Sequence, residues 1–267
     1  MNEIEILLTQ ILNCSYEQLY FDKEINLSCE HKLLEDAIER RLKGEPLAYI
    51  LGKTEFMGLE LRVKNGVFIP RPETEILVEQ TMLLALKLCQ HKDRYLKILD
   101  LATGSGCIAV SLAKYLDNLA KIYAVDICPQ ALAVAKLNAC LHQVKVGFLR
   151  SDLLQGLKYG SFDIIVSNPP YISAEDIDKL PVEISYEPRR ALWGGRDGLR
   201  FFRRIIREAP FYLNTTGYLL MEIGFGQLNS IKNIFKKIKN LRIIDTVKDY
   251  NNIDRIIVAQ KYVQVGD

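Results

Sequence analysis

Paired cysteines, a large excess of either charge and long hydrophobic runs are all missing from this 267-residue chain. The cysteines form no C-x-x-C pair, which argues against a disulfide framework or a zinc site, so we expect no metal and a reducing, cytoplasmic setting. The net charge of only +2 gives no sign of a polyanionic partner, so no direct contact with nucleic acid is expected. The scattered cysteines are Cys14, Cys29, Cys89, Cys107, Cys128 and Cys140.

No apolar run approaches the roughly 18 residues that a membrane-spanning helix needs. The first residues, Met1-Asn2-Glu3, are acidic, and the apolar residues after them are interrupted, unlike a signal peptide. The sequence therefore predicts a soluble cytoplasmic protein without a membrane partner, and we expect it to act as a monomer. Its length favours one large domain and a smaller one.

Residues 1–53 are predicted to form a small helical domain. Apolar residues recur at helical spacing from Ile4 to Leu12, and a second helix is expected from Ser28, its N-cap, to Lys43. Pro46 can open a third helix that ends at Gly52. Two interpretations stay open, a packing cap or a docking surface for a macromolecular substrate.

Residues 54–70 change to an alternating pattern that predicts a β-hairpin linker. Asn65-Gly66 stands between two apolar runs and is the expected hairpin turn. Residues 71–267 are the expected catalytic domain, and they open with a helix that Pro72 and two nearby glutamates favour.

A strand–loop–helix unit follows, typical of a nucleoside-binding sheet. Lys97–Leu101 is the predicted strand, Ala102–Gly106 a tight loop and Cys107–Leu116 a helix. The next strand ends in Asp126, about 20 residues after Gly104, where a carboxylate can hold ribose hydroxyls.

A third strand, Val144 to Leu149, leads to Asp152 and Leu153, which can flank an adenine. The loop lacks the G-x-G-x-x-G spacing of dinucleotide sites, and the chain has no G-x-x-x-x-G-K-[ST] phosphate loop. A nucleoside without phosphate and with an amino-acid tail fits better, and S-adenosylmethionine is such a molecule.

The rest of the chain serves Asn168-Pro169-Pro170-Tyr171, which follows the buried strand Phe162–Ser167. The prolines cannot extend the strand ladder and they stiffen the turn. Asn168 and Pro169 then present fixed carbonyl acceptors beside the flat face of Tyr171. Such a turn suits a planar –NH₂ group. A Pro-terminated strand followed by an ordinary turn is the simpler alternative.

The last two strands, Leu241–Val247 and Ile253–Ala259, are joined by too few residues for a crossover helix and must pair antiparallel. A further parallel strand is predicted at Tyr218–Ile223. The predicted fold class is therefore α/β, with a seven-stranded Rossmann-like methyltransferase sheet, a closing antiparallel hairpin and a small N-terminal helical bundle.

Taken together, the chain resembles the protein-(glutamine-N5) methyltransferases that modify peptide-chain release factors. The resemblance covers nearly the whole length, and two segments make it specific, Pro70-Arg71-Pro72-Glu73-Thr74-Glu75 and Gly194-Gly195-Arg196-Asp197-Gly198. It implies transfer of a methyl group from S-adenosylmethionine to the glutamine of a Gly-Gly-Gln motif. It also implies cofactor contacts at Ala102, Thr103, Gly104, Ser105, Gly106, Asp126, Leu153 and Asn168.

By the same resemblance, Asn168, Pro169, Pro170 and Tyr171 hold the substrate glutamine, with Asn168, Pro169 and Tyr171 as catalytic residues. Two departures from the family pattern, Ala102 for the first loop glycine and Leu153 where an aromatic can stack on adenine, suggest altered cofactor affinity.

Two other functions compete with this one. The same Asn-Pro-Pro-Tyr turn occurs in methyltransferases of exocyclic amino groups in DNA or RNA, but the near-neutral first 50 residues disfavour a nucleic-acid substrate. A catalytically inactive binding module leaves the complete cofactor and acceptor segments unexplained.

Overall fold

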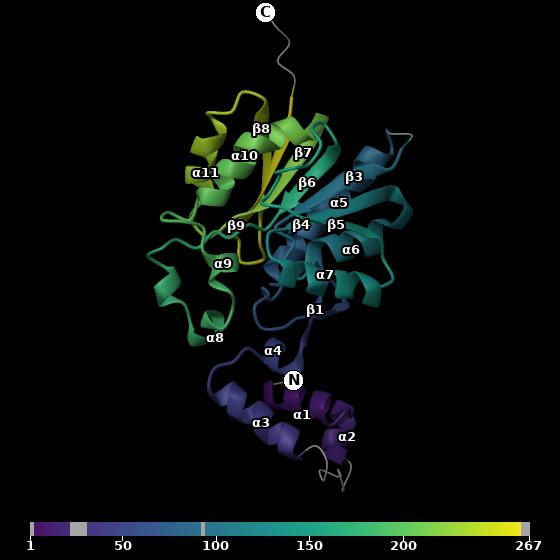
Figure 1. Ribbon diagram of the computed structural model, residues 1–267, viewed down its shortest axis with the longest axis vertical. Coiled ribbons are helices and arrows are strands. Elements are labelled where there is room, and N and C mark those ends of the chain that lie inside the picture. The colour runs from purple at the N-terminus through teal and green to yellow at the C-terminus, as the bar shows by residue number, and fades with distance from the viewer. Residues whose placement is uncertain (1–2, 22–30, 92–93, 263–267) are drawn as a thin grey trace, which may run out of the picture.

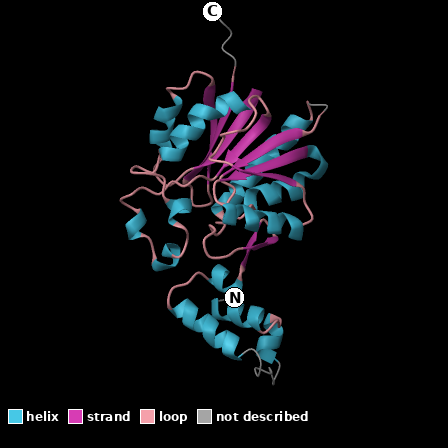
Figure 2. Ribbon diagram, viewed as in Figure 1, coloured by secondary structure: helices cyan, strands magenta, loops and turns pink. Residues whose placement is uncertain are grey.

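A computed structural model describes residues 3–21, 31–91 and 94–262. Most of them build a seven-stranded sheet with helices on both faces, and the N-terminal helices lie at one end of the long axis (Figures 1 and 2). The strand order is β5-β4-β3-β6-β7-β9-β8. The strands are β3 (Leu96–Leu101), β4 (Ala120–Asp126), β5 (Val146–Arg150), β6 (Phe162–Ser167), β7 (Leu213–Glu222), β8 (Leu241–Lys248) and β9 (Asp254–Lys261).

Strands β3 to β7 pair in parallel, whereas β9 pairs antiparallel with both β7 and β8. The antiparallel pair follows from the short connection between β8 and β9, which is closed by the Asp249 N–H donating to the Ile253 carbonyl at 2.8 Å. The predicted fold, a methyltransferase-type sheet with a closing antiparallel hairpin, is confirmed.

Each face of the sheet buries its own hydrophobic core. Ile98 packs with helices α5 (Glu73–Cys89), α6 (Cys107–Leu116) and α7 (Pro129–Leu141), and its neighbour Leu99 packs with the helices of the opposite face. This alternation is the period-two geometry of a strand that is covered on both sides. The opposite face is covered by α10 (Arg200–Tyr212) and α11 (Leu228–Phe235).

The N-terminal part contains α1 (Glu3–Ile11), α2 (Tyr16–Phe21), α3 (His31–Leu42) and α4 (Leu47–Leu51). Gly52 ends α4 in the left-handed conformation expected of a C-cap glycine. The predicted N-cap, Ser28, lies outside the described residues. The Tyr186 hydroxyl donates to the Lys43 carbonyl at 3.0 Å, so a loop of the sheet domain touches the end of the helical part.

A β-hairpin follows α4, but its turn is not the predicted one. Strands β1 (Lys53–Phe56) and β2 (Leu59–Arg62) are joined through Met57 and Gly58, both with positive φ, and Asn65-Gly66 lies beyond the hairpin. The prediction was wrong because the run after Gly66 finds side-chain partners instead of a strand. The Tyr49 hydroxyl donates to the Val67 carbonyl at 2.6 Å, and the Ile69 N–H donates to Glu187 at 3.0 Å.

The long segment between β6 and α10 contains only short helical turns. They are η2 (Ile177–Lys179), α8 (Val182–Ser185) and α9 (Arg189–Leu192), and a fourth such turn, η1 (Asp117–Leu119), precedes β4. Throughout the described part of the chain, the helices are too short or too polar to span a bilayer.

Gly106 begins α6 at φ +82, and a Cβ there would lie 2.8 Å from the Ala135 Cβ of α7. We expect Gly106→Ala to destabilise the protein by more than the roughly 1–2 kcal/mol of left-handed strain, because α7 must also move. The control is Gly156→Ala, since Gly156 has a similar φ of +75 and nothing within 4 Å of its added Cβ. Urea unfolding measures both, and equal losses would contradict the packing role.

Candidate active site

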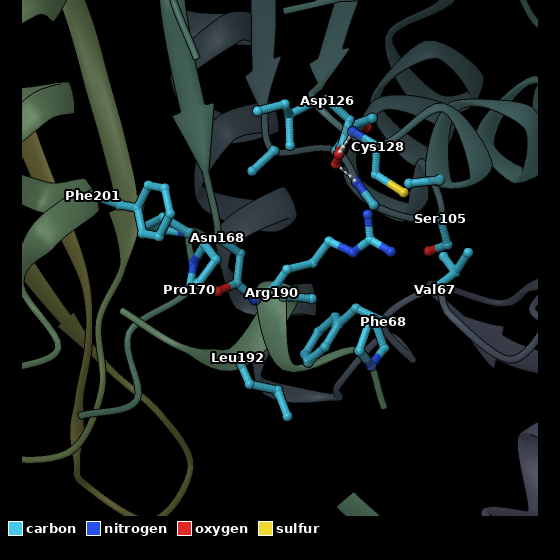
Figure 3. A pocket seen from close by; sticks show the side chains of 18 of the residues that line it. Val67, Phe68, Ser105, Asp126, Cys128, Asn168, Pro170, Arg190, Leu192 and Phe201 are labelled. Atoms are coloured by element: carbon cyan, nitrogen blue, oxygen red, sulfur yellow. Dashed lines mark hydrogen bonds between the residues drawn. The ribbon is translucent and has the colours of Figure 1, made fainter. Parts of the chain in front are cut away.

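A cavity opens at the carboxyl ends of β3, β4 and β6 (Figure 3). The strand order reverses between β3 and β6, and ligands of open α/β sheets bind in the crevice at such a switch point. Because β3 and β6 are neighbours, the loop after β3 and the turn after β6 face each other across it. The cavity gathers nearly all residues predicted for cofactor and substrate. These are Ala102, Thr103, Gly104, Ser105, Asp126, Asp152, Leu153, Asn168, Pro169, Pro170 and Tyr171.

A backbone hydrogen bond to β4 holds the loop after β3. The Thr103 N–H donates to the Val125 carbonyl at 3.0 Å, and a Cβ on Gly104 would meet nothing within 4 Å, so the loop leaves open space for a ligand. Gly106 is placed differently from the other loop residues, since it lies against α7 rather than in the cavity lining.

Asp126, at the end of β4, is anchored with both carboxylate oxygens. Oδ2 accepts the Gly104 N–H at 2.9 Å and Oδ1 accepts the Cys128 N–H at 2.8 Å (Figure 3). Burial raises the pKa of Asp126, and these backbone bonds and the positive charge of Arg190 oppose that rise. Each oxygen keeps a further lone pair, so the carboxylate can accept two hydroxyl groups of a bound ribose.

Asp152 and Leu153 both line the cavity, but the Asp152 carboxylate is shared. Arg204 of α10 donates to its Oδ1 at 2.9 Å. Leu153 is buried at φ +54, a backbone conformation uncommon for residues other than glycine, and this places its side chain at the cavity wall.

Asp100 carries a buried acceptor close to the loop. Its Oδ2 accepts the Thr103 hydroxyl at 2.5 Å, whereas its Oδ1 has no hydrogen-bond partner in the part of the chain that the structure describes. Burial raises the pKa of Asp100 to about 7, against the lowering effect of the Thr103 hydrogen bond. A ligand with a positive charge nearby would favour the ionised form of this carboxyl.

Asn168 is oriented by a chain of two hydrogen bonds that the sequence reasoning missed. Its Nδ2 donates to the Thr74 hydroxyl at 3.0 Å, and that hydroxyl donates to Glu222 Oε2 at 2.7 Å. Thr74 stands in the first turn of α5 and Glu222 ends β7, and both are almost fully buried. The sequence signal for Thr74 was its place in the Pro-Arg-Pro-Glu-Thr-Glu segment.

Two glycines lie in close contact with the backbone of the acceptor turn. A Cβ on Gly194 would come within 2.8 Å of both the Pro170 carbonyl oxygen and the Tyr171 Cα, and one on Gly198 would collide with the Tyr171 carbonyl. Gln227 also donates to that carbonyl at 2.9 Å. The Gly-Gly-Arg-Asp-Gly loop therefore allows the backbone to pack directly against the turn.

Arg190 from α9 extends into the cavity toward Asp126, and Phe68 and Phe201 lie at its edges (Figure 3). None of the three was predicted, because their elements meet the strand ends only in the folded chain.

The chain matches two family models, the PrmC N-terminal domain over residues 1–52 and the methyltransferase small domain over residues 60–192. A release factor glutamine methyltransferase of Thermodesulfovibrio yellowstonii is 40% identical over 98% of this chain and 92% of its own length. The chain belongs to the release factor glutamine methyltransferase family. The Geobacter sulfurreducens member is 42% identical over 96% of this chain and 87% of its length.

Membership of the release factor glutamine methyltransferase family confirms the resemblance and the prediction of a methyltransferase. A solved methyltransferase from Pyrococcus furiosus shares the fold, with a TM-score of 0.55 and 19% identity, over 86% of this chain and 100% of that one.

Ala102 lies at φ +57, a backbone conformation in which an alanine side chain is strained. We expect Ala102→Gly to stabilise the protein by up to about 1 kcal/mol, since relief of strain outweighs the added freedom of the unfolded chain. Urea unfolding measures the change. The matched control, Ala113→Gly within α6, should destabilise by about 1 kcal/mol. A loss of stability in both variants would argue against strain at Ala102.

Burial raises the pKa of Glu222 to about 7, opposed by the Thr74 hydrogen bond and the positive charge of Arg255, while the negative charge of Glu73 adds to the rise. Between about pH 4.5 and 7, the folded protein therefore keeps a proton on Glu222 that the unfolded chain has released. The stability of the folded protein falls as the pH rises through this range. As the pH rises from about 5 to about 8, the unfolding free energy of Glu222→Gln should increase relative to that of wild type by on the order of 1–3 kcal/mol.

Urea unfolding at both pH values measures this difference. For the control Thr81→Val, a buried position of α5, the difference from wild type should not change with pH. A pH-independent difference for Glu222→Gln as well would show that Glu222 has no raised pKa in the folded protein.

Proposed function

We propose that this protein transfers a methyl group from S-adenosylmethionine to the side-chain nitrogen N5 of the glutamine in the Gly-Gly-Gln motif of peptide chain release factors. The observation that carries this proposal is the orientation of Asn168. Its Nδ2 is bound to Thr74, which leaves Oδ1 free to accept an N–H in the cavity. Relatives at about 40% identity over nearly the whole chain carry this activity in their names.

The cavity suits the methyl donor. The anchored Asp126 carboxylate would hold the ribose hydroxyls, Ala102–Ser105 would hold the amino-acid tail, and Asp152 and Leu153 would hold the adenine. The unsatisfied oxygen of Asp100 matches a cationic donor, and Gly106 contributes by shaping the loop. When bound, S-adenosylmethionine supplies an electrophilic methyl group on a positively charged sulfur.

An amide nitrogen is a poor nucleophile because its lone pair is delocalised into the carbonyl. Asn168 Oδ1 and the Pro169 carbonyl each accept one N–H of the substrate amide, which fixes the nitrogen and raises its electron density. Pro170 keeps the turn rigid. Tyr171 packs on the amide plane. The nitrogen loses its proton to solvent after transfer.

Residues 1–53 dock the release factor, residues 54–70 link them to the rest, and residues 71–267 carry out catalysis. Leu33 and Leu42 on α3 are 63% and 83% exposed, so apolar surface is available to a protein partner. These helices lie at the end of the molecule (Figure 1). That the protein acts as a monomer stays a prediction.

The test is incubation with a purified release factor and labelled S-adenosylmethionine, followed by mass spectrometry of the Gly-Gly-Gln peptide. Wild type should add one methyl group to the glutamine. Asn168→Ala should lower the rate roughly 100-fold or more, because one of two amide acceptors is lost. Cofactor binding, measured by calorimetry, should remain.

The control is Asn118→Ala, an exposed asparagine that bonds only to its neighbour Asp117 among the described contacts, and it should keep full activity. RNA serves as the competing substrate. Methyl transfer to RNA and none to the release factor would overturn the proposed substrate, and full activity of Asn168→Ala would overturn the proposed role of the turn.

A further inference from the structure

Three distant segments meet at the buried end of the acceptor turn. Ser167 pairs with Met221 in the sheet, so Asn168 and Glu222 follow at the ends of neighbouring strands. The first turn of α5 places Thr74 between them, bonded to both. Thr74 is 1% exposed and Glu222 is 1% exposed, so water does not compete for these bonds.

The direction of this chain of hydrogen bonds matters. A hydroxyl has a single hydrogen, and Thr74 donates its hydrogen to Glu222 Oε2. The Thr74 oxygen can then only accept, so the side chain of Asn168 must turn its NH₂ group toward it. In the flipped amide, Oδ1 would face the Thr74 oxygen, and two acceptors would meet without a hydrogen between them.

We propose that Thr74, held by Glu222, is the positioning residue that sets the orientation of the Asn168 amide and so presents Oδ1 to the substrate. This inference rests on the proposed function, since it concerns how the same turn receives the glutamine. The two amide orientations are nearly identical in shape, so packing alone cannot choose between them. In the wrong orientation, the Asn168 NH₂ would face the substrate NH₂, and neither could accept.

Prolines fix the backbone of the turn but have no influence on how Asn168 rotates about its last bond. The buried Thr74–Glu222 pair supplies this missing constraint.

The decisive variant is Thr74→Val, which keeps the shape of the side chain and removes the hydroxyl. It should lower kcat for release factor methylation roughly ten-fold or more while leaving the cofactor affinity unchanged. Thr74→Ser, which keeps the hydroxyl, should restore most of the rate. The matched control is Thr81→Val, since Thr81 is equally buried in α5 but bonds only to the Leu77 carbonyl of its own helix.

A second measurement reads the amide itself without turnover. In ¹⁵N-labelled protein, the Asn168 side-chain NH₂ signals are assigned by their loss in Asn168→Ala, and their exchange with deuterated water is followed. Wild type, Thr74→Ser and Thr81→Val should protect these hydrogens, whereas Thr74→Val should exchange them at least ten-fold faster.

The outcomes separate the two levels. If wild type methylates no release factor, the proposed function fails, and the exchange measurement still tests the orientation of Asn168. If wild type is active but Thr74→Val keeps both full kcat and protected Asn168 hydrogens, the positioning role is overturned. An equal loss of kcat in Thr74→Val and Thr81→Val would also overturn it, because the effect would then belong to the helix as a whole.

Discussion

The hydrogen bonds from Asn168 to Thr74 and from Thr74 to Glu222 join three parts of the fold that are far apart in sequence. They require β6 and β7 to be neighbours and the first turn of α5 to lie at the ends of both strands. The Gly194–Gly198 loop packs against the Pro170 and Tyr171 backbone of the same turn. A change in the relative position of any of these elements would move the Asn168 carbonyl, so much of the architecture converges on one side-chain amide.

The cofactor side of the cavity obeys a simpler constraint. Parallel strands end at the same edge, so the loop after β3 and the carboxylate after β4 come together wherever such a sheet forms. Here the Gly104 N–H and Asp126 bind each other, which keeps the loop open and the carboxylate fixed before a ligand enters. Ala102, in the loop after β3, and Leu153, after β5, both have left-handed backbone conformations.

Predictions that depend on local sequence pattern succeeded, and one that depends on contacts with distant residues did not. The strand Phe162–Ser167 and the helix Cys107–Leu116 have the predicted bounds, because continuous apolar runs with clear end signals depend little on distant partners. The Asn65-Gly66 turn failed for the opposite reason. Tyr49 and Glu187, one before it and one far beyond it, hold the following run away from a strand.

By itself, the sequence determined the sheet with its antiparallel end, the strand-end carboxylate Asp126 and the acceptor turn at Asn168, since each depends on local pattern or on the order of elements. The tertiary structure alone decided what each side chain faces. Arg204 donates a hydrogen bond to Asp152, Arg190 extends into the cavity, and Thr74 and Glu222 lie behind Asn168. Those contacts join residues up to 148 positions apart, and no local pattern specifies the direction of a hydrogen bond across such a separation.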